Sequence, residues 1–478
     1  MGKKIMIFLT AWLCFFLIPT AIPASDVIEN NNSGIPDQEL YQSILEELGK
    51  KPNQKFTRQE AEKIQALTAA PHEIKSLKGI KYLKNLKNLN LTGSNLKNLN
   101  GIEDLIKLET LDVSYNLIKS VKPLKKLKNL RYLYCGSNQI ETLKGIEKLK
   151  KLETLDASYN RLTSIKEIRG LKNMGYLDLS ENEITSVKPL KNLKKVKKLF
   201  LSYNKLNSLN GIENLTRITC LDARGNRLTS IKQLKKLKKL RKLYIKENQL
   251  TDLKGIETLV NLKYLNASSN QLRNIQGIQK LEKLWYLNLG RNCLVSAGEI
   301  AKLKKLRILN LCFNKLSSLP DFRKIHHLSG FGIAYNHLSL EEISRKTPKY
   351  LFLDDWEEYL KVMALVQNVD YTLQFTEPSD ITQIHKNMDR ITGHAYMPDA
   401  VVQMIVSRSR MEDDDCEVIL REVRVDENGD FVFDNLNFDQ LEPGYDYFIA
   451  FDIDYDFYKV TTDSDYYYDP SLRWYRIN

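Results

Sequence analysis

Two nearly identical segments, LETLDVSYN at Leu108–Asn116 and LETLDASYN at Leu152–Asn160, begin 44 residues apart in this 478-residue chain. Each fits the pattern LxxLxLxxN, and its final asparagine recurs every 22 residues without a break. A strict period of this length indicates a repeat array in which each repeat forms one structural coil. The asparagines of this series are Asn116, Asn138, Asn160, Asn182, Asn204, Asn226, Asn248, Asn270, Asn292, Asn314 and Asn336.

The apolar residues of one repeat predict the structure of its coil. Leu111 and Val113 alternate with polar residues, which is the period of a short β-strand with its apolar side chains pointing inward. The apolar residues after the asparagine come every third residue, which favours 3-10 or short helical turns. One coil cannot bury this stripe, but stacked coils share a continuous leucine core. We therefore expect about 13 coils with a curved parallel β-sheet along one side.

The recurring asparagine is expected to be buried in the turn that follows each strand. A buried side-chain amide must satisfy its donors and its acceptor, and the turn backbone of its own and neighbouring coils can do so. The series is therefore predicted to be structural, as a ladder that ties each coil to the next.

The repeat resembles the 22-residue leucine-rich repeat of bacterial internalins, with steps such as Pro123–Leu124 and Gly145–Ile146. The segment before the array, which contains Asp37, Phe56 and Glu60, resembles the helical N-terminal cap of the same family. The resemblance implies an α/β repeat solenoid: a curved parallel sheet, a convex side of 3-10 or short helices, and a helical N-terminal cap. An all-β Ig-like sandwich is expected to follow the solenoid.

Five parts are expected along the chain. The first is an export signal, because two lysines precede an apolar run that ends near prolines and small residues. An uncleaved membrane anchor is the alternative interpretation of this stretch. The parts are a signal peptide at 1–25, the helical cap at 26–63, the leucine-rich repeats at 64–340, a C-terminal cap and connector at 341–390, and the Ig-like module at 391–478.

The C-terminal part differs from the array in charge and in pattern. Residues 393–478 carry 20 acidic and 7 basic residues, a net charge of −13, whereas the rest of the chain carries +26. Asn428-Gly429 lies between alternating apolar residues, which predicts a β-hairpin turn. Asp452, Asp454 and Asp456 share one face of a predicted strand, and a solvated strand face is preferred to a calcium loop because Phe457 replaces the glycine that such a loop needs.

No motif of an enzyme, a cofactor site or a metal site is found. The chain lacks GxSxG, P-loop, HExxH and GxGxxG motifs, and its histidines are dispersed. The six cysteines are scattered and none stands in CxxC spacing, so neither a disulfide framework nor a zinc site is indicated. We expect no catalysis, no cofactor and no metal.

Strand geometry predicts which side chains face outward from the sheet, because the residues between the inward leucines point to the opposite side. Aromatic residues gather there in two clusters, with aspartates beside the first, and exposed aromatics on a rigid sheet are typical of binding hot spots. Cross-strand stacking without a ligand is the alternative. Tyr115, Tyr159, Tyr203 and Tyr335, each just before a ladder asparagine, are interpreted as structural. The predicted partner-binding residues of the concave face are Tyr132, Tyr134, Tyr176, Phe200, Tyr244, Tyr264, Trp285, Tyr286, Asp112, Asp156, Asp178 and Asp222.

The resemblance to internalins implies protein–protein recognition through the concave face, with a host surface or cytosolic protein as the partner. The alternative is an envelope protein that binds an anionic cell-wall polymer or glycan through lysines of the convex side, such as Lys235 and Lys236. The protein is expected to be secreted, and loosely wall-associated if the alternative holds. Neither nucleic-acid binding nor a membrane span after signal cleavage is expected.

Overall fold

The computed structural model describes residues 26–69 and 73–348, and seven strands of the C-terminal part. The chain divides into two compact units, Met1–Arg227 and Leu228–Asn478, which are described separately. The predicted signal peptide at 1–25 lies outside the described residues. Within the described part, no helix has the length and apolar character that a membrane span requires.

The first unit begins with a small helical segment. Helix α1 (Gln38–Glu47) is amphipathic and buries Leu40 and Ile44, and it contacts the first strand of the array. The carboxylate of Asp37 accepts a hydrogen bond from Leu40 N at 3.0 Å, and it also accepts bonds from the backbone N of Lys75 and Ser76. One side chain therefore caps the helix and ties it to the first coils. Strands β1 (Val27–Ile28) and β2 (Phe56–Thr57) pair antiparallel, and α2 (Arg58–Ala61) follows with a capping box.

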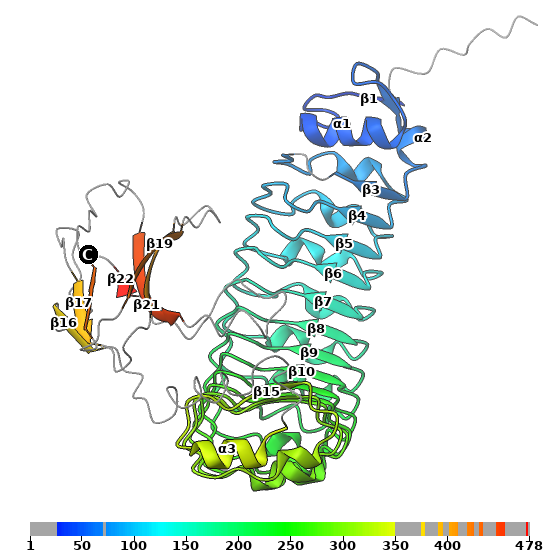
Figure 1. The fold of residues 1–478 in the computed structure, drawn as a ribbon. Helices are drawn as coiled ribbons and strands as arrows, with labels where there is room; N and C mark the ends of the chain where they lie inside the picture. The colour runs from blue at the N-terminus through cyan, green and yellow to red at the C-terminus, as the bar shows by residue number, and fades with distance from the viewer. Residues whose placement is uncertain are drawn as a thin grey trace, which may run out of the picture. The chain divides into compact units, whose positions relative to one another are not determined.

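The repeats of the first unit stack as a parallel sheet in which each strand pairs with the strand one repeat later (Figure 1). Leu111 is in register with Leu133, and Leu133 with Leu155, so equivalent residues lie side by side. The strands are β3 (Ala66–Thr68), β4 (Asn88–Asn90), β5 (Thr110–Asp112), β6 (Tyr132–Tyr134), β7 (Thr154–Asp156), β8 (Tyr176–Asp178), β9 (Lys198–Phe200) and β10 (Cys220–Asp222).

Short 3-10 helices form the opposite side of these coils, as the three-residue spacing of leucines predicts. The apolar residues of one coil are fully buried against those of its neighbours, as at Leu111, Val113, Ile118 and Leu124. The stacked coils therefore share a continuous core. The helices of this unit are η2 (Ile80–Tyr82), η3 (Ile102–Asp104), η4 (Lys122–Lys126), η5 (Ile146–Lys148), η6 (Lys166–Gly170) and η7 (Lys188–Asn192).

Two kinds of coil begin their 3-10 helices differently. In one kind a glycine with positive φ precedes the helix, as at Gly145 (φ 116°), and its N–H donates to the Glu147 carboxylate at 2.6 Å. In the other kind the residue before the helix is not a glycine. Helix η4, for example, follows Val121 and has Pro123 in its first turn. The Gly-Ile and Lys-Pro-Leu steps of the sequence correspond to these two kinds of coil.

The second unit continues the same repeat. Its strands are β11 (Lys242–Tyr244), β12 (Tyr264–Asn266), β13 (Tyr286–Asn288), β14 (Ile308–Asn310) and β15 (Gly330–Gly332), parallel and in register from each to the next. Its 3-10 helices are η8 (Lys232–Lys236), η9 (Ile256–Thr258), η10 (Ile278–Lys280), η11 (Gly298–Lys302) and η12 (Phe322–Lys324).

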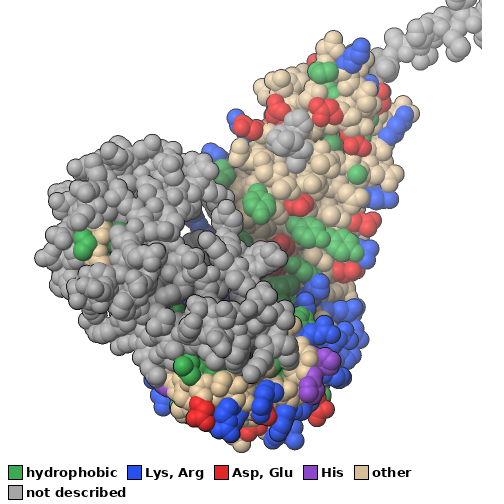
Figure 2. Space-filling model, viewed as in Figure 1, with side chains coloured by type: hydrophobic (Ala, Val, Ile, Leu, Met, Phe, Trp, Pro, Cys, Tyr) green, Lys and Arg blue, Asp and Glu red, His purple; other side chains and the backbone are tan. Residues whose placement is uncertain are grey.

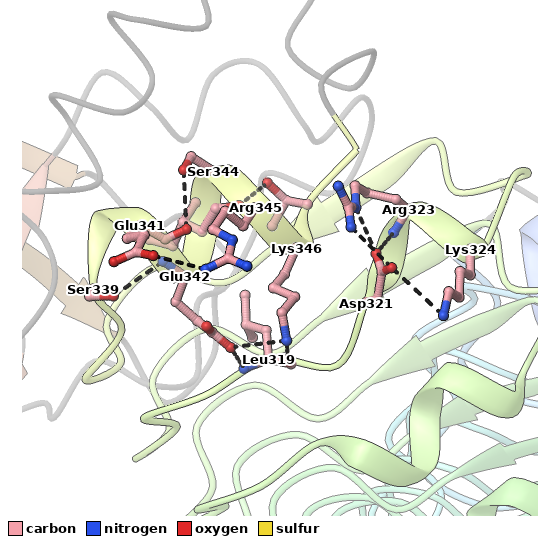
Figure 3. A network of polar contacts seen from close by, with 12 residues as sticks. Leu319, Asp321, Arg323, Lys324, Ser339, Glu341, Glu342, Ser344, Arg345 and Lys346 are labelled. Carbon is pink, nitrogen blue, oxygen red and sulfur yellow. Dashed lines mark hydrogen bonds and ion pairs between the residues drawn. The ribbon is translucent and has the colours of Figure 1, made fainter.

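Helix α3 (Leu340–Lys346) follows the last coil and is attached to it by side chains (Figure 3). Ser339 caps the helix, and Glu342 accepts a hydrogen bond from Leu319 N at 2.8 Å. Lys346 donates to Leu319 O at 3.2 Å and lies 3.7 Å from the Glu342 carboxylate. These bonds satisfy the backbone of a loop that no further coil covers.

The described C-terminal strands form two antiparallel sheets, β16-β17-β20 and β19-β18-β21-β22. Asn428-Gly429 falls outside the described residues, and the strands on either side of it, β19 and β20, belong to different sheets. The hairpin turn predicted there therefore stays a prediction. Asp452 and Asp454 lie within strand β21, as a strand face requires. The strands are β16 (Gln374–Glu377), β17 (Ile391–His394), β18 (Val401–Ser409), β19 (Val418–Arg424), β20 (Asp430–Phe433), β21 (Asp446–Asp454) and β22 (Tyr475–Arg476).

Candidate binding surface

The ladder asparagines hold the turns that follow the strands. Asn160 accepts a hydrogen bond from Ile140 N at 2.8 Å through Oδ1, and its Nδ2 donates to the carbonyls of Cys135, Ala157 and Ser158. The same pattern recurs along the series, with all members buried except Asn138, which is half-buried. Each asparagine therefore joins its own turn to the preceding coil, and the outward face of the sheet rests on this frame.

The first aromatic cluster lies on strands β6 to β9. The rings of Tyr176 and Phe200 pack with their centroids 5.5 Å apart, and the Arg131 guanidinium lies 5.3 Å from the centre of the Tyr132 ring. Tyr134 stands in register between Asp112 and Asp156. Figure 2 shows hydrophobic side chains lying beside acidic ones over the strands of this unit. The first cluster therefore consists of aromatic rings with acidic side chains beside them.

Burial and neighbouring carboxylates change the acidity of this cluster. Burial raises the pKa of Tyr176 to about 12, and the negative charges of Asp178 and Asp156 contribute to the rise. Burial also raises the pKa of the Asp178 carboxyl, and hydrogen bonds from Ser180 and Tyr176 oppose this effect. The Tyr176 hydroxyl therefore remains a protonated donor at neutral pH.

The aspartates of this face also have a structural role that the sequence pattern did not reveal. Asp156 accepts a hydrogen bond from Ser158 N at 3.0 Å, two residues further along, and Asp178 accepts one from Ser180 N at 3.0 Å. Such an Asx turn closes the chain after the strand. The other coils with this bond use Asn90, Asp112, Asp222, Asn266, Asn288 and Asn310.

Asp222 is buried, although the sequence predicted it to be an exposed residue of the concave face. Its side chain is only 4% exposed, and its carboxylate pairs with the Arg224 guanidinium at 3.1 Å. A residue this buried offers little contact to a partner, so Asp222 is removed from the exposed part of the candidate surface. Arg224 lies two residues further along, and the aromatic Phe200 is in register with Asp222 on the neighbouring strand.

From β4 to β14, three coils carry an aromatic residue where the others carry Asp or Asn. These residues are Tyr134, Phe200 and Tyr244, and an aromatic ring cannot accept the Asx-turn hydrogen bond. These coils forgo a bond worth about 1 kcal/mol. The fold alone therefore does not account for the aromatic rings at these positions.

The second aromatic cluster lies on strands β11 to β13. Tyr264 and Tyr286 are stacked with centroids 4.0 Å apart and an angle of 7° between their planes, and Tyr244 packs against Tyr264 at 4.7 Å. Trp285 meets both Tyr264 and Tyr286 edge-on, and it is 37% exposed. The four rings form one platform, which a partner can cover without a large loss of side-chain entropy.

Two of the tyrosines interpreted as structural from the sequence are exposed in the structure. Tyr115 is 67% exposed and Tyr159 is 59% exposed, whereas Tyr335 is only 6% exposed. The structural interpretation fits Tyr335 but does not fit the side chains of Tyr115 and Tyr159. The 22-residue period locates these residues, but their exposure depends on side chains in the adjacent coils.

The described residues hold no group of metal-ligating side chains, and burial affects the thiol of Cys312. In residues 26–69 and 73–348, no three His, Cys, Asp or Glu side chains are grouped as metal ligands. Burial raises the pKa of the Cys312 thiol to about 11, so this thiol stays protonated at neutral pH. The arrangement of this face suits recognition, since its aromatic rings, hydroxyls and carboxylates are contact groups.

The repeats match the family described as leucine rich repeats (2 copies) at residues 106–148, 150–192, 216–258 and 238–280. A periodic parallel sheet, 3-10 helices and an asparagine ladder define the same class. The chain belongs to the leucine-rich repeat proteins, and it is internalin-like.

Solved structures show the same relationship. An internalin from Listeria monocytogenes is 28% identical with a TM-score of 0.62, and the match covers 65% of this chain and 94% of that one. A leucine-rich repeat protein from Leptospira interrogans is 30% identical with a TM-score of 0.56, over 63% of this chain and 82% of that one. A plant peptide hormone receptor in complex with RGF2 is 21% identical with a TM-score of 0.52, over 59% and 50%, which shows a common fold alone. No curated protein matches the chain.

Proposed function

We propose that this chain is a secreted, non-enzymatic protein that recognises a protein partner through the outward face of its parallel sheets. The observation that supports this function is the substitution of Asp or Asn by Tyr134, Phe200 and Tyr244. These rings replace a hydrogen bond that the other coils from β4 to β14 keep, and they extend both aromatic clusters. Large rigid rings on a sheet provide contact area at low entropic cost, which is how hot spots bind proteins.

The partner would be a host surface or cytosolic protein, as the likeness to an internalin suggests. The first cluster offers aromatic rings beside Asp112, Asp156 and Asp178, which suits a partner segment with both apolar and basic side chains. The second cluster offers the stacked platform of Tyr264 and Tyr286, which suits an apolar or aromatic side chain. The C-terminal strands would form an Ig-like spacer.

The proposal is tested by giving the aromatic positions the residue that the other coils use. The triple variant Tyr134→Asn, Phe200→Asn and Tyr244→Asn supplies an amide that can close each Asx turn, so we expect the fold to be retained. Capture of a partner from host-cell lysate is expected to be lost, and capture on purified cell wall is measured beside it. If capture from the lysate is unchanged, the binding site lies elsewhere on the chain.

A matched control comes from the same column of the sheet. Asn90→Asp keeps the Asx-turn acceptor, which bonds Thr92 N at 3.0 Å, and lies outside both aromatic clusters. We expect this variant to capture the partner as the unmodified chain does. Thermal unfolding of both variants separates a loss of contact from a loss of fold.

The alternative function is electrostatic retention on an anionic cell-wall polymer. Lys235, Lys236, Lys238 and Lys239 are all exposed along one coil of the second unit, which favours attraction to a polyanion. Other lysines have structural partners: Lys151 donates to Asn129 at 2.8 Å and Lys195 donates to Asn173 at 2.7 Å. Retention of this kind predicts release of cell-associated protein by high salt. Protein that stays bound in molar salt argues against it.

A further inference from the structure

From Gly93 to Tyr335, one backbone position recurs in each coil with a left-handed conformation. It is the residue immediately before the ladder asparagine, and we call it the edge position. Its φ is 55° at Tyr115, 53° at Ser137 and 50° at Tyr159. A left-handed conformation costs a residue with a Cβ about 1–2 kcal/mol, and it is rare for bulky residues. The edge positions of the first unit are Gly93, Tyr115, Ser137, Tyr159, Glu181, Tyr203 and Gly225.

The fold uses only the backbone of the edge position. The N–H of Tyr115 donates to Gly136 O at 3.0 Å, and that of Tyr159 donates to Ser180 O at 3.0 Å. The N–H of Ser137 makes the same bond to Ser158 O at 2.9 Å. Because serine, glutamate and tyrosine are all found there, the repeat does not require an aromatic side chain.

Aromatic residues at the edge position of the second unit are explained by packing. Phe313 and Tyr335 occupy consecutive coils, and their rings stack at 4.2 Å with an angle of 23° between the planes. The Arg291 guanidinium lies 4.5 Å from the centre of the Phe313 ring, and Tyr335 is nearly buried. These three side chains form a continuous stack along the edge.

Tyr115 and Tyr159 have no such explanation. Their side chains are 67% and 59% exposed, and their neighbours along the edge include the small residues Gly93 and Ser137. Gly93 leaves open space, since a Cβ added to it would meet no atom within 4 Å. Large apolar rings are therefore exposed on a backbone that disfavours them, and such an outlier indicates a function.

The spacing of the two coils that carry these rings points to a kind of ligand. Strand β5 pairs with β6 and β6 with β7, so Tyr115 and Tyr159 are two strands apart. Two strand spacings amount to about 10 Å. This length corresponds to one disaccharide unit of an extended β-linked polysaccharide. The C–H faces of sugar rings carry partial positive charge and stack on the negative faces of aromatic rings.

We propose that the edge of the first unit binds an extended β-1,4-linked glycan, with Tyr115 and Tyr159 each stacking on a sugar ring one disaccharide apart. Glu181, one coil beyond Tyr159, supplies a carboxylate for sugar hydroxyls. A protein partner is less suited to this edge, because protein hot spots are contiguous and enclosed by other contacts. Isolated rings at a fixed interval suit a polymer with the same interval. This site is distinct from the aromatic clusters of the sheet face.

The test uses the full chain with three probes: chitohexaose in solution, insoluble cellulose, and purified peptidoglycan. Tyr115→Ser and Tyr159→Ser introduce the residue found at Ser137, so the fold is expected to be kept or stabilised. Each variant is expected to weaken binding to the preferred glycan about tenfold, as the loss of one stacking ring does. Affinity is also expected to rise steeply from the disaccharide to the tetrasaccharide, because both rings are then covered.

Tyr134→Asn is the control, because it changes an aromatic residue of the sheet face and should leave glycan binding intact. Comparison of the three probes identifies the source of the glycan. The proposal is overturned if the unmodified chain binds none of the three, or if the double edge variant binds them as well as the unmodified chain. Loss of a captured protein in the edge variants, with glycan binding unchanged, would also overturn it and assign the edge to the protein interface.

Discussion

Two polar side chains fix the turn after most strands of the array. In the coil of β7, Asp156 accepts bonds from Ser158 N and Ser158 Oγ, and Asn160 bonds the backbone of its own and the preceding coil. A buried backbone group that loses its partner costs more than a typical hydrogen bond contributes. These side chains therefore determine the stability of the frame on which the aromatic residues are displayed.

Asn160→Ala is expected to lower the free energy of unfolding by about 1–3 kcal/mol, because Ile140 N and several carbonyls lose their partner while they remain buried. Urea denaturation followed by circular dichroism measures the change. Asn138→Ala is the matched control, since Asn138 is half-buried and water can replace part of what is lost. An equal cost at both positions would contradict the role of burial.

Asp178→Asn is expected to stabilise the protein at neutral pH. Burial raises the pKa of Asp178 above its ordinary value of 3.8, so the folded chain holds this proton more tightly than the unfolded chain does. The carboxyl therefore lowers stability as the pH rises from 3.8 through the folded pKa, and asparagine removes this loss while it can still accept from Ser180 N. Thermal unfolding at several pH values should show a gain at pH 7 that disappears below 3.8. A gain that is independent of pH would contradict this explanation.

Much of the frame was predictable from the sequence because its rules are local and periodic. The spacing of Leu155 and Asn160 gives the strand, the turn and the 22-residue repeat without knowledge of any distant contact. The burial of Asp222 was not predictable, because it depends on the side chains that surround it, such as Arg224 and Phe200. The openness of Tyr115 depends on which residues occupy the adjacent coils. The assignment of β19 and β20 to different sheets depends on strands far along the chain, which a local turn pattern does not report.

At the level of elements, the residue that precedes each 3-10 helix sets how closely neighbouring coils stack. Gly145 has a φ of 116°, and a Cβ added there would lie 2.9 Å from Lys122 Cα in the preceding coil. The coil that follows a Lys-Pro-Leu step therefore needs a residue without a side chain at this position. Gly211, which follows the other Lys-Pro-Leu step, makes the same approach: a Cβ added there would lie 2.6 Å from Lys188 Cα.

Gly145→Ala is expected to lower the free energy of unfolding by at least about 1–2 kcal/mol, from the positive φ alone. The close approach to Lys122 adds to this cost because the atom it meets belongs to the backbone. Gly298→Ala is the matched control in the second unit, because a Cβ there would meet only Ser296 Oγ at 3.8 Å. We expect that variant to be neutral or stabilising by about 0.4–1 kcal/mol. Equal destabilisation by both substitutions in thermal unfolding would show that neither the positive φ nor the close approach at Gly145 is the cause.

At the level of the whole molecule, the two aromatic clusters belong to different compact units. The first unit presents Tyr134 and Phe200 among aspartates, and the second presents the stacked rings of Tyr264 and Tyr286. A partner that contacts both clusters gains from two sets of contacts on one chain. A partner that needs only one leaves the other available for a second ligand.

A cycle of variants separates these possibilities. One variant carries Tyr134→Asn and Phe200→Asn, a second carries Tyr244→Asn and Tyr286→Asn, and a third carries all four changes. We expect each pair to raise the Kd of the captured partner about tenfold or more, since truncation of hot-spot residues costs at least about 1–2 kcal/mol. The losses in binding free energy should add in the combined variant, because the two pairs change different rings. Titration calorimetry measures all four chains. A combined variant that binds as tightly as the unmodified chain would contradict recognition through this face, whereas an unchanged Kd in one pair alone would assign the interface to the other unit.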